Sequence, residues 1–214
     1  MDFIDEKLEN YALKHTEKEP EVLKNLNRET CLKVMRPRMI SGPLQGRFLS
    51  ILSHMISPKR VLEIGTYTGY SALCIAEGML EDSELITIDV NEELMPMVEK
   101  YTKLYGKENI IKMIVGDATQ VLPTLKGTFD LVFIDADKEN YTLYVKQSLN
   151  LINKGAYVVI DNVLWSGKVV GEKSQMDKET LAIDEVNKFV SNCPDLQQIL
   201  LPLRDGLMIC RKVS

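Results

Sequence analysis

The chain has 214 residues, of which 45% are hydrophobic and 27% charged, and its formal net charge is −5. This balance is typical of a globular protein and excludes disordered, collagen-like and coiled-coil architectures. The mild acidity excludes a general attraction to nucleic acid or to anionic membranes. No apolar run approaches the roughly 20 residues of a membrane-spanning helix, and the charged start MDFIDEKLEN lacks the apolar core of a signal peptide. We therefore expect a cytoplasmic protein.

Short β-rich segments alternate with helical patterns from residue 60 onward. Strands are predicted at Arg60–Ile64, Glu84–Asp89, Ile111–Val115, Phe129–Ile134, Ala156–Ile160, Leu196–Leu201 and Leu207–Arg211. Helices are predicted near Ser71–Met79, Glu92–Tyr105, Thr119–Leu125, Lys138–Leu149 and Asp177–Ser191. The repeated β-α-β order with Ile- and Val-rich strands indicates a parallel sheet covered on both faces. Because only Pro202–Gly206 joins the last two strands, the final strand is predicted to be antiparallel.

The first 59 residues have a different, mainly helical character. Pro37, Gly42 and Pro43 interrupt them before a helix predicted at Gln45–Ile56. We interpret residues 1–59 as a helical cap on the sheet, so that residues 1–214 form a single domain with an α/β core over 60–214.

Polar residues at the carboxyl ends of the first three strands indicate a nucleoside-type site, because ligands of open α/β sheets bind there. The first strand leads into Gly65-Thr66-Tyr67-Thr68-Gly69, and Tyr67 stands where a dinucleotide-binding motif requires glycine, which disfavours NAD. Asp89 is placed to accept ribose hydroxyls; the alternative is a helix N-cap, for which Asn91 is better placed. Asp117 either receives an adenine amino group or opens a capping box.

A second set of oxygen ligands follows the fourth and fifth strands. Asp135 closes the fourth strand, and Asp161 and Asn162 close the fifth, so these side chains are expected to converge. Two carboxylates and an amide oxygen suit Mg²⁺. The alternative is local, with Asp137 capping a helix and the Asp161-Asn162 pair forming a turn.

Two further residues near this set have open interpretations. Lys138 lies in the first turn of its helix, where the dipole disfavours a cation by about 0.3–1 kcal/mol. A lysine there beside carboxylates indicates a chemical role, such as accepting a substrate proton; the alternative is a solvated surface lysine. Trp165, the only tryptophan, either walls an aromatic substrate or covers the core.

Six segments occur in order over residues 35–214, namely VLEIGTYTGYS, ITIDVN, GDA, FIDADKENY, IDNVLWSG and LPLRDGLMICRK. Together they resemble the cation-dependent O-methyltransferases of the caffeoyl-CoA and catechol type. The resemblance implies a Rossmann-like, doubly wound, seven-stranded and mostly parallel sheet with an antiparallel last strand. It also implies S-adenosylmethionine (SAM) as methyl donor, Mg²⁺ or another divalent cation, a small aromatic acceptor with vicinal hydroxyls, and a homodimer, with no nucleic-acid or membrane partner.

The resemblance also implies roles for individual positions. The cofactor residues are Ser41, Glu63, Gly65, Thr66, Ser71, Asp89, Ala118 and Asp137, to which the strand-end position adds Asp117. The metal ligands are Asp135, Asp161 and Asn162, the general base is Lys138, and Tyr144 is a substrate residue; we add Trp165 as a second substrate residue from its position in the sequence. Two departures stand out: Arg204 replaces the glycine that many relatives carry, and the amino terminus is shorter than in the plant enzymes.

The implied mechanism is direct methyl transfer. Both catechol oxygens chelate the metal, Lys138 takes or stabilises the departing proton, and the phenolate attacks the sulfonium methyl in line. Three alternatives stay open at this point: an NAD-dependent dehydrogenase, a nucleic-acid amino-methyltransferase, and a non-catalytic cofactor-binding protein. The second would carry an Asn/Asp-Pro-Pro-aromatic motif after the fourth strand, which this sequence lacks.

Overall fold

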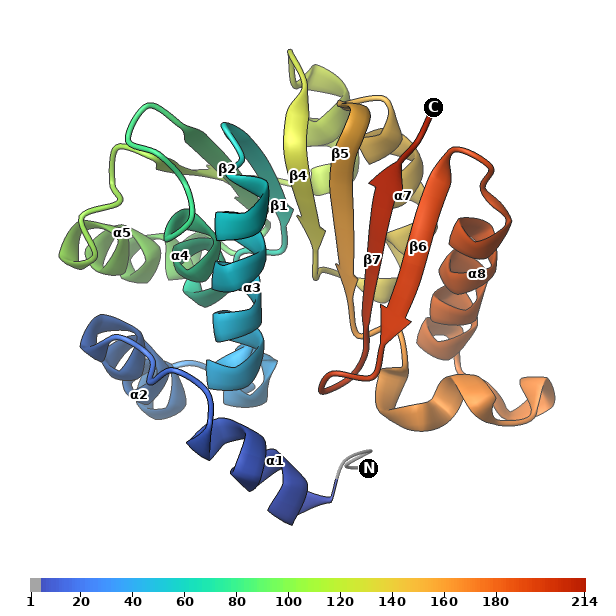
Figure 1. The fold of residues 1–214 in the computed structure, drawn as a ribbon, viewed down its shortest axis with the longest axis horizontal. Coiled ribbons are helices and arrows are strands. Elements are labelled where there is room, and N and C mark those ends of the chain that lie inside the picture. Colours follow the sequence, from blue (N-terminus) through green and yellow to red (C-terminus); the bar gives the residue numbers. More distant parts are fainter. Residues whose placement is uncertain (1–4) are drawn as a thin grey trace. The chain divides into compact units, whose positions relative to one another are not determined.

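The computed structural model describes residues 5–214, which form two compact units (Figure 1). The amino-terminal unit comprises Glu6–Asp117, and the carboxyl-terminal unit comprises residues 118–214. Within the described residues, no helix is both long and apolar enough to cross a membrane.

The amino-terminal unit contains three parallel strands. They are β1 (Arg60–Ile64), β2 (Glu84–Asp89) and β3 (Ile111–Val115), all at their predicted positions. The middle strand is β2, which pairs in register with β1 through Leu62↔Ile86 and with β3 through Ile86↔Lys112. The inner strands are almost wholly buried, which explains why they are continuous apolar runs in the sequence.

The helices of this unit are α1 (Glu6–Lys14), α2 (Glu21–Lys33), η1 (Pro37–Met39), α3 (Gly42–Ile56), α4 (Tyr70–Ala76), η2 (Glu92–Leu94) and α5 (Met95–Leu104). The helix α3 begins three residues before its predicted start, because Pro43 fits the first helical turn, where its missing N–H would have no partner. The helix α4 ends before its predicted end, close to the point where it meets α3. There a Cβ atom on Gly78 would lie 2.3 Å from the backbone nitrogen of His54.

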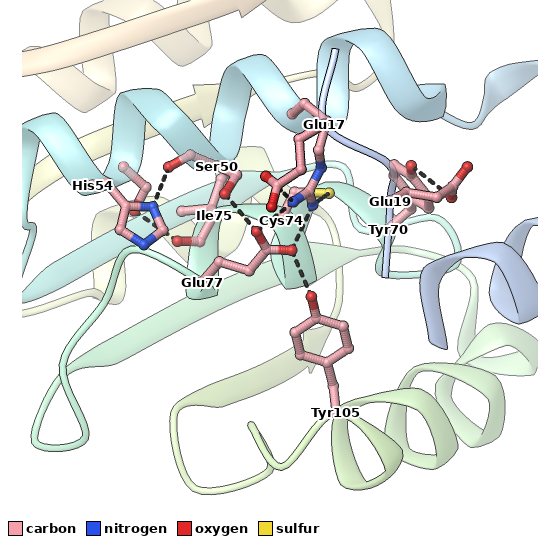
Figure 2. Close-up of polar contacts among 11 residues, drawn as sticks. Glu17, Glu19, Ser50, His54, Tyr70, Cys74, Ile75, Glu77 and Tyr105 are labelled. Atoms are coloured by element: carbon pink, nitrogen blue, oxygen red, sulfur yellow. Dashed lines mark hydrogen bonds and ion pairs between the residues drawn. The ribbon is translucent and has the colours of Figure 1, made fainter. Parts of the chain in front are cut away.

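A buried polar cluster joins three of these helices (Figure 2). Arg47 on α3 is 3% exposed, and its Nη1 and Nη2 atoms donate to the Glu77 carboxylate at 2.8 and 2.5 Å. Glu77, which directly follows α4, also accepts from Ser50 on α3 and from Tyr105 at the end of α5, both at 2.5 Å. One carboxylate therefore fixes the packing of α3, α4 and α5.

The carboxyl-terminal unit contains four strands in the order β4, β5, β7, β6. They are β4 (Phe129–Ile134), β5 (Ile152–Asp161), β6 (Leu196–Leu201) and β7 (Leu207–Lys212). The first two are parallel, and β7 is antiparallel to both β5 and β6, as Figure 1 shows. The predicted reversal of the last strand is confirmed. The strand β5 begins four residues before its predicted start, at Ile152, which pairs with Phe129.

The helices of this unit are α6 (Ala118–Val121), η3 (Leu122–Thr124), η4 (Lys138–Asn140), α7 (Tyr141–Leu149), η5 (Trp165–Val170), η6 (Lys173–Gln175) and α8 (Lys178–Asn192). Asp177 caps α8 by accepting the Thr180 N–H at 2.8 Å. The predicted helix from Lys138 begins as a 3₁₀ turn and becomes α-helical at Tyr141. This tight first turn brings Lys138 and Tyr141 to the end of β4.

Candidate active site

The cofactor residues of the amino-terminal unit gather around the turn that follows β1. Gly65 and Gly69 have φ angles of 98° and 83°, and Tyr67 adopts the same left-handed region with φ of 47°. The turn remains close to β2, because the Gly65 N–H donates to the Ile88 carbonyl at 2.9 Å. The predicted tight turn is therefore present where β1 leads into α4, and its role in ligand binding stays a prediction.

Asp89, at the end of β2, is bonded to this turn. Its Oδ2 atom accepts the N–H groups of Thr66 and Tyr67 at 3.1 and 2.7 Å, and its Oδ1 atom accepts the Asn91 N–H at 2.9 Å. Asn91 is the residue that caps the following helix, by accepting the Glu93 N–H at 3.1 Å. The carboxylate of Asp89 is thus held in a fixed orientation by backbone donors.

Glu63 lies inside the amino-terminal unit and is fully buried. Its carboxylate accepts from the Ser71 hydroxyl at 2.6 Å and from the Thr87 hydroxyl at 2.5 Å. The Thr87 and Thr66 hydroxyls are also 2.5 Å apart. Glu63, Thr66 and Ser71 therefore form one network beneath the turn, and Thr87 is a member that the sequence did not reveal.

The remaining predicted cofactor residues lie at other strand or helix ends. Ser41 is 4% exposed and precedes α3. Asp117 is exposed and follows β3, and Ala118 is buried at the start of α6. Their cofactor roles stay predictions.

The carboxyl-terminal unit brings the predicted metal ligands to neighbouring strand ends. Ile134 of β4 pairs with Ile160 of β5, so the next residues along the two strands are Asp135 and Asp161. Asp161 is 2% exposed, and its Oδ1 atom accepts the Asn162 N–H at 2.7 Å. Asn162 has a φ of 59°, a left-handed conformation that asparagine tolerates better than most residues.

Lys138 is a buried cation with three acceptors. Its Nζ atom lies 3.0 Å from Asp135 Oδ1, 2.9 Å from the Ala136 carbonyl and 2.7 Å from the Tyr141 hydroxyl. Only 8% of the residue is exposed, so the alternative of a solvated surface lysine is wrong.

Tyr141 shows how closely the acidic side chains gather. Its burial raises the pKa of the hydroxyl well above its usual value, and the negative charges of Asp135, Asp161 and Asp137 raise it further, against a backbone hydrogen bond at Ala136 that lowers it. The negative charges of three carboxylates thus act on the Tyr141 hydroxyl. Sequence reasoning missed this residue; its position three after Lys138 was the available signal.

Asp137 and Tyr144 pair with each other. The Tyr144 hydroxyl donates to Asp137 Oδ1 at 2.5 Å, and Asn140 donates to Oδ2 at 2.6 Å. Tyr144 is only 2% exposed, and Asp137 makes no capping hydrogen bond to the helix that follows it. The cofactor role of Asp137 and the substrate role of Tyr144 stay predictions.

Two lysines lie near the ring of Trp165. The Nζ atoms of Lys138 and Lys168 are 5.5 and 5.8 Å from its ring, within the range of cation–π attraction. Its indole nitrogen is buried without a hydrogen-bond partner within the part of the chain that the structure describes. The ring therefore packs against the Lys138 head group.

The carboxylates near Asp135 are too few to hold a metal ion by themselves. Across residues 5–214 no group of three His, Cys, Asp or Glu side chains is arranged to hold a metal ion. Two carboxylates and the Asn162 amide are hard oxygen donors of the kind that Mg²⁺ accepts while keeping positions for water or substrate. The residues present therefore fit a divalent cation only with the amide included.

Comparison with known proteins first identifies the class. A solved structure, the SAH-bound methyltransferase PaMTH1 of Podospora anserina, superposes with a TM-score of 0.89 at 29% identity, covering 97% of this chain and 94% of that one. The O-methyltransferase TomG of Streptomyces achromogenes, in complex with SAM, gives a TM-score of 0.88 at 25% identity, covering 97% and 96%. The predicted Rossmann-like methyltransferase fold, with seven mostly parallel strands, is thereby confirmed.

The sequence comparison then gives the family. The O-methyltransferase family model matches residues 13–213. Caffeoyl-CoA O-methyltransferase 1 of Arabidopsis thaliana is 34% identical over 212 residues, covering 92% of this chain and 80% of that protein. The chain therefore belongs to the O-methyltransferase family, as a SAM-dependent enzyme.

Proposed function

We propose that this enzyme methylates one hydroxyl of a small aromatic vicinal diol, with the assistance of a divalent cation such as Mg²⁺. The observation that carries the proposal is that Asp135 and Asp161 follow paired residues at neighbouring strand ends, with the buried Lys138 amine 3.0 Å from Asp135. A weakly acidic hydroxyl is activated when a bound cation lowers its pKa and a nearby base takes its proton. The carboxylates can hold such a cation, and the amine can serve as the base.

Asp135, Asp161 and Asn162 would hold the cation. When bound, a divalent cation lowers the pKa of a coordinated hydroxyl. The chain orients these donors firmly: Asp161 is buried and bonded to the Asn162 backbone, and Asp135 is bonded to Lys138.

As a cation, Lys138 would stabilise the negative charge left on the acceptor oxygen, and in its neutral form its Nζ lone pair would take the hydroxyl proton. Its three acceptors fix this atom beside Asp135, so the amine does not have to be ordered when the acceptor arrives. Trp165, packed against the same amine, offers a flat wall to an aromatic ring. We assign these two residues, together with Tyr144, to the acceptor half of the site.

The turn after β1 would hold SAM in the other half. Asp89, fixed by the Thr66 and Tyr67 backbone, has further lone pairs for ribose hydroxyls. The helix start after the turn favours the carboxylate of the methionyl group. We propose that Ser41, Glu63, Gly65, Ser71, Asp117, Ala118 and Asp137 complete the cofactor site, with Glu63 and Ser71 acting through the network beneath the turn.

The test measures methyl transfer from SAM to a panel of catechols, including caffeic acid and caffeoyl-CoA, with Mg²⁺ and with EDTA. We expect turnover that EDTA abolishes and Mg²⁺ restores. Turnover that EDTA leaves unchanged would refute the cation, and no turnover on any diol despite demonstrated SAM binding would refute the acceptor class.

Two variants assign the roles. Asp161→Ala should abolish the response to Mg²⁺, and Lys138→Ala should lower kcat while leaving SAM affinity nearly unchanged. Asp195→Ala and Lys154→Ala are matched controls, because both residues are exposed and neither lies at the carboxyl end of β4 or β5. Wild-type turnover in Asp161→Ala would remove the metal role, and wild-type turnover in Lys138→Ala would remove the base.

We further propose a cytoplasmic homodimer, as the family resemblance implies. Light scattering on the purified chain should give about twice the monomer mass of 24.3 kDa. A mass equal to that of the monomer would contradict the dimer.

A further inference from the structure

The loop from Asn162 to Gly167, here called the Asn162–Gly167 loop, has an unusual backbone. Asn162, Trp165 and Ser166 all have left-handed φ angles, of 59°, 46° and 52°. Residues other than glycine adopt this region at a cost, so a run of them persists only where surrounding contacts hold it. Two residues of the proposed site, Asn162 and Trp165, therefore depend on contacts made by their neighbours.

The turn between β6 and β7 supplies these contacts. The Ser166 N–H donates to the Asp205 carboxylate, the Leu164 N–H to the Asp205 carbonyl at 2.9 Å, and the Val163 N–H to the Gly206 carbonyl at 3.2 Å. The two segments touch so closely that a Cβ atom on Gly206 would lie 2.6 Å from the Leu164 side chain. The turn therefore supports the loop along most of its length.

Asp205 is held in place by the shape of its own turn. Arg204 has a φ of 50° and Gly206 a φ of 87°, both in the left-handed region. The Gly206 N–H closes the turn on the Leu203 carbonyl at 2.9 Å. The conformation at Arg204 is one that glycine adopts freely and that other residues adopt at a cost.

The side-chain contact of Asp205 reaches the acceptor half through one residue. Ser166, whose N–H it accepts, directly follows Trp165, and the Trp165 ring packs 5.5 Å from Lys138 Nζ. At the other end of the loop, Asn162 is the third ligand of the proposed cation site, beside Asp135 and Asp161. The contacts of Val163, Leu164 and Ser166 therefore hold the backbone that connects Asn162 to Trp165.

We propose that Asp205 is a positioning residue of this enzyme, whose carboxylate holds the Asn162–Gly167 loop in its left-handed conformation. The proposal rests on the proposed function, in which Lys138, Asn162 and Trp165 serve the acceptor half. Asp205 acts through the Ser166 backbone and takes no part in the chemistry itself.

Trp165 provides a direct readout, because it is the only tryptophan in the chain. Its emission spectrum and its quenching by acrylamide report the packing of its ring without any substrate. The variants are Asp205→Ala, which removes the acceptor, and Asp205→Asn, which keeps an oxygen of similar position. Asp195→Ala is the matched control: Asp195 belongs to the same unit, and its carboxylate accepts from the Ser214 hydroxyl.

In Asp205→Ala we expect a shifted emission spectrum, greater quenching and a kcat reduced by about tenfold or more, the effect of losing one hydrogen bond to a charged group. The KM for SAM should stay within about twofold, and Asp205→Asn should restore most of both signals. Far-UV circular dichroism checks the fold; if Asp205→Ala does not fold, Asp205→Glu, which displaces the carboxylate by one methylene group, should give the same shifts.

Wild-type emission and quenching in Asp205→Ala would overturn the proposal, as would shifted emission with an unchanged kcat. A wild-type enzyme that methylates no vicinal diol would refute the proposed function instead. In that case the emission of Asp205→Ala would still decide whether Asp205 holds the loop.

Discussion

Replacing Glu77 by leucine removes the nearer of two ionic partners of Arg47, a cation that is only 3% exposed. The other partner, Glu17, is 3.8 Å from Arg47 Nη1 and its side chain is 78% exposed, so it compensates for the buried charge only weakly. Breaking a buried ion pair by removing one partner costs about 3–5 kcal/mol. For a chain of this size each kcal/mol lowers the unfolding midpoint by about 2–4 °C, so a fall of about 6–20 °C is expected.

Urea unfolding followed by far-UV circular dichroism measures the free energy. The double variant Arg47→Met/Glu77→Leu should recover most of the loss, because no unpaired charge is left inside. Lys24→Ala is the control: it breaks an ion pair with Glu21 whose side chains are 48% and 74% exposed, and should cost under about 1 kcal/mol. A Glu77→Leu variant within about 1 kcal/mol of wild type would refute the reasoning, since loss of the close carboxylate partner of the buried Arg47 would then carry no penalty.

The pKa of Glu77 also predicts how the stability of the chain depends on pH. Burial raises the pKa of Glu77, but hydrogen bonds from Arg47, Ser50 and Tyr105 outweigh it and hold the pKa below its ordinary value of 4.5. A group whose pKa is lowered on folding stabilises the folded chain above its ordinary pKa and loses that contribution as the pH falls. The stability gap between wild type and Glu77→Leu should therefore narrow below about pH 4.5.

Three further substitutions test other contacts. Hydrogen bonds, chiefly from Lys100, lower the pKa of Glu29 from 4.5 to about 2. Glu29 therefore stabilises the folded chain above pH 4.5 and loses this contribution as the pH falls toward 2. In Glu29→Gln the free energy of unfolding should fall less steeply between pH 4.5 and 2 than in the wild type. Gly78→Ala places a methyl group 2.3 Å from backbone of α3 and should cost about 1–3 kcal/mol in urea unfolding. Thr87→Val removes a hydroxyl that donates to the buried Glu63 carboxylate and should cost about 1.5–3 kcal/mol by the same measurement.

Each of these has an outcome that contradicts it. An unchanged fall in the free energy of unfolding between pH 4.5 and 2 in Glu29→Gln would show that its hydrogen bonds contribute nothing to folding. Gly106→Ala is the control for Gly78, because no atom lies within 4 Å of its Cβ position and only its φ of 68° is strained; equal costs at the two sites would refute the steric argument. Full stability in Thr87→Val would show that Glu63 is satisfied without that donor.

The strands were predictable because buried parallel strands are continuous apolar runs, and β1 to β4 lie where the Ile- and Val-rich segments are. The start of β5 was not, since Asn153, Lys154 and Gly155 are poor strand formers that lie in an irregularity between the pairs Phe129↔Ile152 and Leu131↔Tyr157. Similarly, Gly42-Pro43 was interpreted as an interruption, whereas it is the first turn of α3.

The meeting of Asp135 and Asp161 followed from the sequence, because the ends of neighbouring parallel strands lie at one edge of a sheet. Tyr141 and Asp205 could not be found in this way. The Tyr141 hydroxyl accepts from Lys138 Nζ, and the three-residue spacing alone does not record the Lys138 rotamer that makes this contact. Asp205 meets Ser166 across 39 positions of the chain, through a hairpin whose register is set by tertiary pairing.

The three backbone donors on the Asp89 carboxylate have a consequence for the kinetics of ligand capture. These contacts order the turn after β1 from within the chain, so binding there does not include the conformational entropy cost of ordering the turn. Association should then be a single step that scales linearly with ligand concentration. Differences in affinity among ligands of this turn should arise in their rates of departure.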